Sequence, residues 1–215
     1  MEYLSVDAIA LLLKQPDLHT RAGIRDLALL SLLYESGCRV QELIDLKLGN
    51  VSFNVPATIT VTGKGNKVRI IPLSSNVNAI VSKYIHLHKI FNPEQYLFTN
   101  NHSAPLTRSG ITYILRKYTE KAMQKEPALF GNTTVHPHVL RHSKAMHLLE
   151  SGVNLIYIRD FFGHSSVTTT EIYARSNPEI KRKFLEEAAL NIDSGIEKYS
   201  EEEKQTLLEW LKNAI

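Results

Sequence analysis

Apolar residues recur at intervals of three and four along most of the chain. This spacing puts them on one face of a helix and predicts that each helix buries one side. Ser, Thr and Asn precede several of these segments as capping residues, and Gly or Pro follows them. The predicted helices cover residues 6–14, 21–35, a segment opening at 38, 76–90, 107–123, a segment from 137 that stops at 152, 155–162, a segment from 168, 179–190 and a last one from 200.

The hydrophobic period changes to two in one short region. Residues 57–62 and 67–72 alternate and are rich in β-branched side chains, and Gly63-Lys64-Gly65-Asn66 joins them. This combination predicts a β-hairpin. Residues 96–98 are a further short strand candidate. The predicted fold class is therefore mainly α with a small antiparallel β-sheet (α+β).

Length and composition are sufficient for one full core. The chain has 215 residues, of which 43% are hydrophobic, and its single cysteine, Cys38, forms no internal disulfide. We expect Cys38 to be part of the core and the compartment to be reducing. There is no signal-peptide pattern, and no apolar run approaches the ~18 residues that span a bilayer. These features predict a cytoplasmic protein that uses no membrane.

Charge is distributed unevenly along the chain. The formal net charge is +3, yet residues 193–215 hold six acidic residues against three lysines. Residues 1–192 therefore carry +6, a moderate basic bias compatible with a polyanionic partner.

Chemically active side chains gather at the ends of three short predicted helices. His138 and Arg141 lie at i and i+3 behind Pro137, so both point from one helix face. His164 follows the Gly that ends the next helix. A capping-box pattern then starts a third helix, with Tyr173 in its first turns. Two imidazoles, a guanidinium and a phenol in this arrangement predict a functional site and not only a hydrophobic core.

Two motifs earlier in the chain complete a recognisable set. Arg39 opens a predicted helix with Glu42 one turn later, and Lys64 lies in the hairpin turn. In order and approximate spacing, the motifs resemble the catalytic domain of the tyrosine recombinases, the phage-integrase family, over about residues 4–185. The matching positions are Arg39, Lys64, His138, Arg141, His164 and Tyr173.

The resemblance has small departures and one large one. Cys38 and Val40 flank the first arginine where other apolar residues are common, and His136 stands where a small hydroxyl residue is frequent. We expect the N-terminal DNA-gripping domain that such enzymes usually carry to be absent, so that the chain is either an excised fragment or an unusual short form. We expect residues 1–190 to be the catalytic domain and residues 191–215 to be a linker with an amphipathic helix.

The family implies a DNA breaking-rejoining enzyme fold and a site-specific recombinase or integrase, serving a mobile element or a chromosome. Its partner is double-stranded DNA. The working unit is a homo-tetramer on paired sites, and the free protein is a monomer or weak dimer. No cofactor is implied.

The chemistry also follows from the residue types. Breaking a phosphodiester without water or ATP needs a protein nucleophile, which would be Tyr173, with a 3′-phosphotyrosyl polarity that the resemblance implies. A phenol has a pKa of about 10, so a cationic surrounding and His138 as proton acceptor would help it ionise. Lys64 would protonate the leaving 5′-oxygen. Lys67 is the weaker candidate, because the family pattern puts the lysine directly after the first glycine.

The remaining residues would stabilise the transition state. Guanidiniums match non-bridging phosphate oxygens with paired hydrogen bonds, so Arg39 and Arg141 are the candidates, and His164 would donate one more. Glu42 would orient Arg39 or a neighbour. With these cations present, a metal ion is unnecessary, and we predict no metal site.

Three alternatives remain open. His138 and His142 are at i and i+4, as zinc ligands can be, with His164 as a third, but Val139 replaces the glutamate of an H-E-x-x-H motif. A DNA-binding relative without activity would lack one of the six positions. A type IB topoisomerase uses the same covalent chemistry. The C-terminal helix from 200, able to dock on its own domain or on a neighbouring subunit, favours recombination.

Overall fold

A computed structural model describes residues 2–163 of the chain. The chain divides into the units Met1–Ile180 and Lys181–Ile215, and every described residue belongs to the first. The helices predicted from 168, over 179–190 and from 200 lie outside the described residues. None of the described helices is long and apolar enough to cross a membrane.

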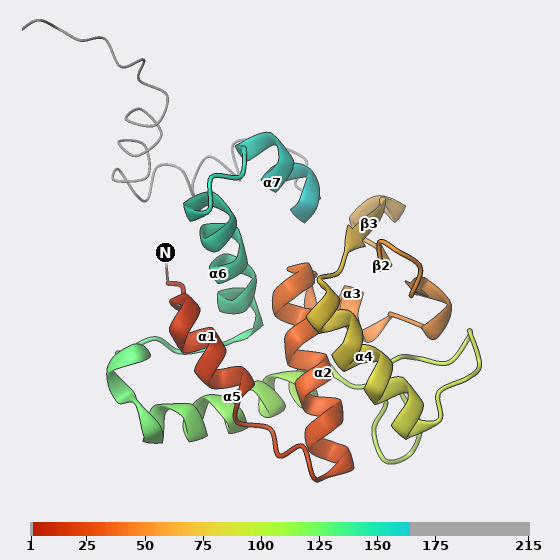
Figure 1. Cartoon of the computed structure of the whole chain (residues 1–215), viewed down its shortest axis with the longest axis horizontal. Coiled ribbons are helices and arrows are strands. Elements are labelled where there is room, and N and C mark those ends of the chain that lie inside the picture. Colours follow the sequence, from red (N-terminus) through yellow and green to blue (C-terminus); the bar gives the residue numbers. More distant parts are fainter. Residues whose placement is uncertain (1, 164–215) are drawn as a thin grey trace, which may run out of the picture. The chain divides into compact units, whose positions relative to one another are not determined.

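Helices dominate the described part, as the hydrophobic pattern predicts (Figure 1). The α-helices are α1 Val6–Leu13, α2 Arg21–Ser36, α3 Val40–Ile44, α4 Ser75–His88, α5 Arg108–Lys125, α6 Pro137–Glu150 and α7 Leu155–Phe162. Short 3-10 turns are η1 Leu48–Asn50, η2 Lys64–Asn66 and η3 Pro127–Leu129. The strands are β1 Val51–Ser52, β2 Thr58–Thr62 and β3 Val68–Pro72.

Helix α2 is the centre of the core. Leu29, Leu30, Leu32 and Leu33 are all at most 1% exposed, so this part of α2 is covered on every side. Helices α4 and α6 both pack on α2, and α1 packs on α5 (Figure 1). A helix that is apolar all round must be surrounded in this way.

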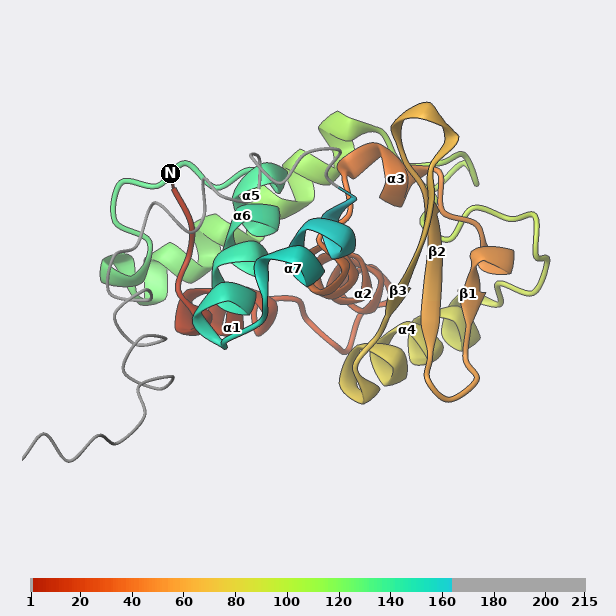
Figure 2. The ribbon, with the colours of Figure 1, turned by 90° about the horizontal axis from the view of Figure 1, so that it is seen from above.

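The predicted hairpin is confirmed and belongs to a three-stranded antiparallel sheet. Its strand order is β1-β2-β3, and the sequence pattern did not predict the two-residue β1. Ile59 pairs with Ile71, and Val61 pairs with Arg69, so all four side chains share one face. The three apolar members are buried. Figure 2 shows the sheet at one side of the helices.

The strand predicted at residues 96–98 is wrong. Tyr96 makes one isolated bridge with Lys47, and no ladder continues from it. Leu97 and Phe98 are both fully buried, although consecutive residues of a strand point to opposite faces. The apolar run reflects burial of an irregular segment, whose Leu97 amide donates to the Leu46 carbonyl at 2.7 Å.

A buried carboxylate ties α2 to α5. Asp26 is 1% exposed, and its Oδ1 accepts from Arg25 Nε and Nη2 at 3.0 and 2.7 Å. Its Oδ2 accepts from the Tyr118 hydroxyl at 2.9 Å. Burial and this hydrogen bond raise the pKa of Tyr118, so the phenol keeps its proton and remains the donor.

We expect Tyr118→Phe to lower the free energy of unfolding by about 1–3 kcal/mol, because Asp26 Oδ2 loses its donor inside the protein. Urea denaturation followed by circular dichroism measures the change. Tyr113→Phe on the same helix is the matched control, since Tyr113 is 60% exposed. Equal losses in the two variants would show that the Asp26 hydrogen bond is not a stabilising tie.

Candidate active site

The corner between α2 and α3 sets the position of Arg39. Gly37 adopts a left-handed conformation, with φ of 53°, and ends α2. A Cβ at Gly37 would overlap the ring of Phe162, so glycine is required for packing as well as for backbone conformation. Arg39 is then the N-cap of α3. Cys38 is buried between them, as predicted, and burial raises the pKa of its thiol to about 11.

Glu42 holds Arg39 by two separate contacts. Its Oε2 accepts from the Arg39 amide at 2.8 Å, and its Oε1 accepts from Arg39 Nη1 at 2.9 Å. The Glu42 side chain is 4% exposed, whereas that of Arg39 is 40% exposed. The carboxylate is thus part of the interior, and the guanidinium keeps an accessible edge. The two contacts hold the backbone and the guanidinium of Arg39 in place.

Arg141 joins the ends of two other helices. It is 6% exposed on α6. Its Nη2 donates to the Phe162 carbonyl at 2.9 Å, and its Nη1 donates to the Gly37 carbonyl. Its Cζ also lies 4.7 Å from the centre of the Phe162 ring, a cation–π distance. Arg141 is therefore fixed against the ends of α2 and α7.

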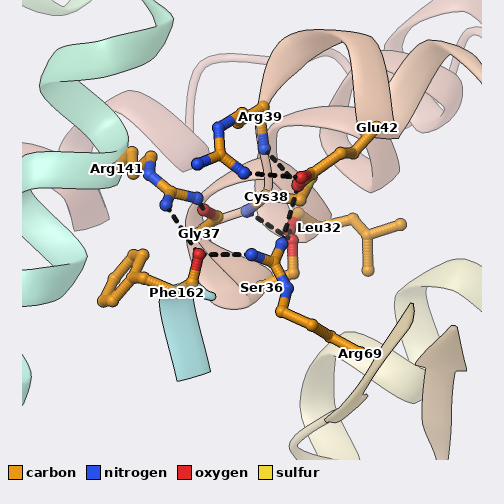
Figure 3. Close-up of polar contacts among 9 residues, drawn as sticks. All are labelled: Leu32, Ser36, Gly37, Cys38, Arg39, Glu42, Arg69, Arg141 and Phe162. Carbon is orange, nitrogen blue, oxygen red and sulfur yellow. Dashed lines mark hydrogen bonds and ion pairs between the residues drawn. The ribbon is translucent and has the colours of Figure 1, made fainter. Parts of the chain in front are cut away.

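A third arginine, Arg69, enters this cluster and was not predicted from the sequence. From β3, its Nη2 donates to Glu42 Oε2 at 2.7 Å, and its Nη1 donates to the Phe162 carbonyl. Figure 3 shows Arg39, Arg69 and Arg141 converging on Glu42 and this carbonyl. The available signal was strand alternation, which puts Arg69 on the inward face beside Ile71.

His138 lies in the first turn of α6, and its side chain is exposed. Partial burial of the ring lowers its pKa, and so do the charges of His136, Arg141 and Arg39, in that order. The neutral imidazole is therefore favoured, and this form accepts a proton. The charges of both arginines therefore act on this imidazole.

A cleft of about 460 Å³ opens beside these groups. A second cleft of about 360 Å³ shares Arg108 and Thr112 with it. Together they are lined by Arg39, Val40, Gln41, Arg108, Ser109, Thr112, Tyr113, Arg116, His136, Pro137 and His138. None of these lining residues is acidic, so the surface suits an anion.

The remaining predicted residues differ in how far the structure describes them. Lys64 opens the turn η2 at the tip of the β2–β3 hairpin. His164 and Tyr173 lie outside the described residues. Within residues 2–163, no three His, Cys, Asp or Glu side chains are grouped as metal ligands, and the third ligand of the zinc hypothesis is His164 itself.

Comparisons with known proteins show the family of the chain. The model of the phage integrase family matches residues 2–179. The tyrosine recombinase XerD of Staphylococcus haemolyticus is 38% identical over 190 residues, which are 85% of this chain and 61% of the relative. XerD of Staphylococcus aureus (strain N315) is 37% identical over 191 residues, 85% of this chain and 61% of the relative. The chain thus spans about 61% of the length of these curated relatives.

Solved structures have the same fold. The crystal structure of XerA recombinase superposes with a TM-score of 0.72 and 29% identity, covering 93% of this chain and 65% of that one. The catalytic domain of bacteriophage HP1 integrase superposes with a TM-score of 0.56 and 21% identity. The superposition covers 92% of this chain and 99% of that one. At that identity, the second comparison supports the fold alone.

The charge of Arg39 is one of the influences that lower the pKa of His138, and this gives a testable prediction. Arg39→Ala removes one cation that disfavours the imidazolium, so we expect the pKa of His138 to rise towards its ordinary value of about 6.5. A histidine titration by NMR measures the shift. Arg21→Ala, at the opposite end of α2 from Gly37, is the control and should leave His138 unchanged. An unaltered His138 titration in Arg39→Ala would show that the charge of Arg39 does not act on this imidazole.

Proposed function

The chain belongs to the phage integrase family, and from this premise we propose that it is the catalytic part of a site-specific tyrosine recombinase. Such an enzyme cleaves and rejoins strands of double-stranded DNA without a metal ion or ATP. One observation carries the proposal. Arg39, held by Glu42, and His138 line one cleft, and the charge of the buried Arg141, which comes from a different element than Arg39, acts on the same imidazole.

The arginines would bind the reacting phosphate. A phosphoryl transition state concentrates negative charge on its non-bridging oxygens, and guanidinium groups donate paired hydrogen bonds to such oxygens. Arg39 presents an accessible edge while Glu42 holds its other side. Donors fixed in advance need little reorganisation during the reaction. His164 would supply a further hydrogen bond.

Tyr173 would be the nucleophile. Its phenol oxygen attacks phosphorus, the new ester is a 3′-phosphotyrosyl bond, and the bond to the 5′-oxygen breaks. The proton of the phenol passes to His138, whose lowered pKa keeps it neutral and able to accept. Lys64 gives a proton to the departing 5′-oxygen. Reversal of these steps with another 5′-hydroxyl rejoins the strands.

The proposal extends to the domain organisation, the assembly and the location of the protein. We propose residues 1–190 as the catalytic domain and residues 191–215 as a linker and amphipathic helix that is exchanged between subunits. The active form would be a homo-tetramer on two paired DNA sites, which the mass of the protein–DNA complex tests. A DNA substrate would place the protein in the bacterial cytoplasm, at the nucleoid.

A covalent adduct tests the central claim. On a nicked DNA site that loses its short 5′-hydroxyl fragment, the protein should become attached to DNA and migrate slowly in a denaturing gel. Tyr173→Phe should abolish the adduct but retain DNA binding. Arg39→Ala should lower the cleavage rate by roughly 10²–10³, the typical loss for one oxyanion donor.

Two outcomes would contradict this assignment. An adduct that survives Tyr173→Phe means that another residue is the nucleophile. Cleavage that stops with excess chelator and returns with zinc would favour the His138–His142 metal hypothesis instead.

The identity of the general acid is tested separately. Lys64→Ala should slow cleavage of ordinary DNA strongly, and a substrate with a 5′-bridging sulfur should restore the rate, because a thiolate leaves without being protonated. Lys67→Ala, in the same hairpin, is the matched control and should behave like the unaltered protein on both substrates. If the sulfur substrate rescues Lys67→Ala alone, the lysine assignment is wrong.

A further inference from the structure

We propose that Arg69 is a positioning residue that fastens the Lys64 hairpin to the elements holding Arg39 and Arg141. The proposal rests on the function proposed above, because it concerns how the Lys64 hairpin is kept in position relative to Arg39 and Arg141. Arg69 is assigned no contact with DNA. It acts through Glu42 and the backbone at the end of α7.

The contacts of Arg69 join three elements. The residue belongs to β3, its Nη2 lies 2.7 Å from Glu42 Oε2 on α3, and its Nη1 donates to the Phe162 carbonyl at the end of α7. Glu42 also holds Arg39, and the same carbonyl also accepts from Arg141. One guanidinium thus shares an acceptor with each of the two arginines (Figure 3).

The burial of the hairpin explains why this contact matters for its tip. Ile59, Val61 and Ile71 are buried and anchor the base of the sheet. Beyond the Val61–Arg69 pair, none of the side chains described between Thr62 and Val68 is buried. Among the described side chains, Arg69 is therefore the last partly buried one on the inward face before the turn that starts with Lys64.

The chemistry of the contact requires a guanidinium. Its two terminal nitrogens reach two acceptors on different elements at once, whereas a lysine ammonium is a single point donor. Arg69 Nε is buried and has no hydrogen-bond partner among the described residues. An unpaired buried donor costs free energy, so the two terminal contacts must offset this cost to hold the observed orientation.

The end of α7 is shaped to receive this arginine. Gly163 has a φ of 60°, and a Cβ built on it would overlap the Arg69 guanidinium. The side chain therefore occupies the space that any other residue at this position would need. This close packing lets a strand arginine reach the carbonyl immediately before Gly163.

The test compares Arg69→Ala and Arg69→Lys with Arg21→Ala, a control that removes an exposed arginine from the start of α2. Hydrogen exchange of the free proteins is measured first. We expect faster exchange at residues 62–68 in both Arg69 variants, with unchanged exchange in α2 and α4. This measurement needs no DNA and no activity, and Arg69→Lys remains informative if Arg69→Ala fails to fold.

Cleavage is measured next at saturating DNA. Misplacing a reacting group by about 1 Å costs roughly 10²-fold in rate, so Arg69→Ala should lose cleavage rate on this scale with unchanged DNA affinity. Arg69→Lys should be intermediate. The 5′-bridging sulfur substrate should recover most of the loss, and Arg69→Ala combined with Lys64→Ala should be no slower than Lys64→Ala alone.

Each other result overturns the proposal. Unchanged hydrogen exchange at residues 62–68 in the Arg69 variants would show that Arg69 does not fasten the hairpin tip. A cleavage loss that the sulfur substrate does not recover shows that Arg69 acts on Arg39 through Glu42 rather than on the Lys64 hairpin. If the unaltered protein forms no covalent adduct, the proposed function fails, while hydrogen exchange still decides whether Arg69 fastens the hairpin.

Discussion

The cationic cluster depends on one buried carboxylate. Arginines gathered at the junction of α2, α3, α6, α7 and β3 repel one another, and burial removes the water that would screen them. Glu42 counters this repulsion from inside, because it is 5% exposed and accepts from the side chains of both Arg39 and Arg69. A buried carboxylate is itself costly unless its oxygens are occupied, so acid and arginines require one another.

Main-chain carbonyls complete this balance. Arg141 donates to the carbonyls of Gly37 and Phe162, which hold its plane while carrying only partial negative charge. Both carbonyls stand at helix C-terminal ends, where unpaired carbonyls point along the axis and favour cations. Helix termination therefore supplies acceptors at the place where the cluster needs them. The absent Cβ of Gly37 leaves room for the Phe162 ring, and that of Gly163 leaves room for Arg69.

The sequence was most informative where interactions are local. Arg39 and Glu42 are one helical turn apart, and the hairpin turn lies between two alternating runs, so spacing alone predicted both features. Arg69 was missed because its partners are 27 and 93 residues away, and no local pattern encodes such distances. The strand prediction for residues 96–98 was wrong although its pattern is local, because a short apolar run is equally compatible with a buried irregular segment.

Cys38 gives this architecture a built-in chemical reporter. It is the single cysteine of the chain, it is buried between Gly37 and Arg39, and burial raises its pKa to about 11. A thiol reagent attacks the thiolate, so modification requires that the α2–α3 corner first open to solvent. The rate of thiol labelling consequently reports the opening equilibrium of the arginine cluster in the unaltered protein, without an introduced probe.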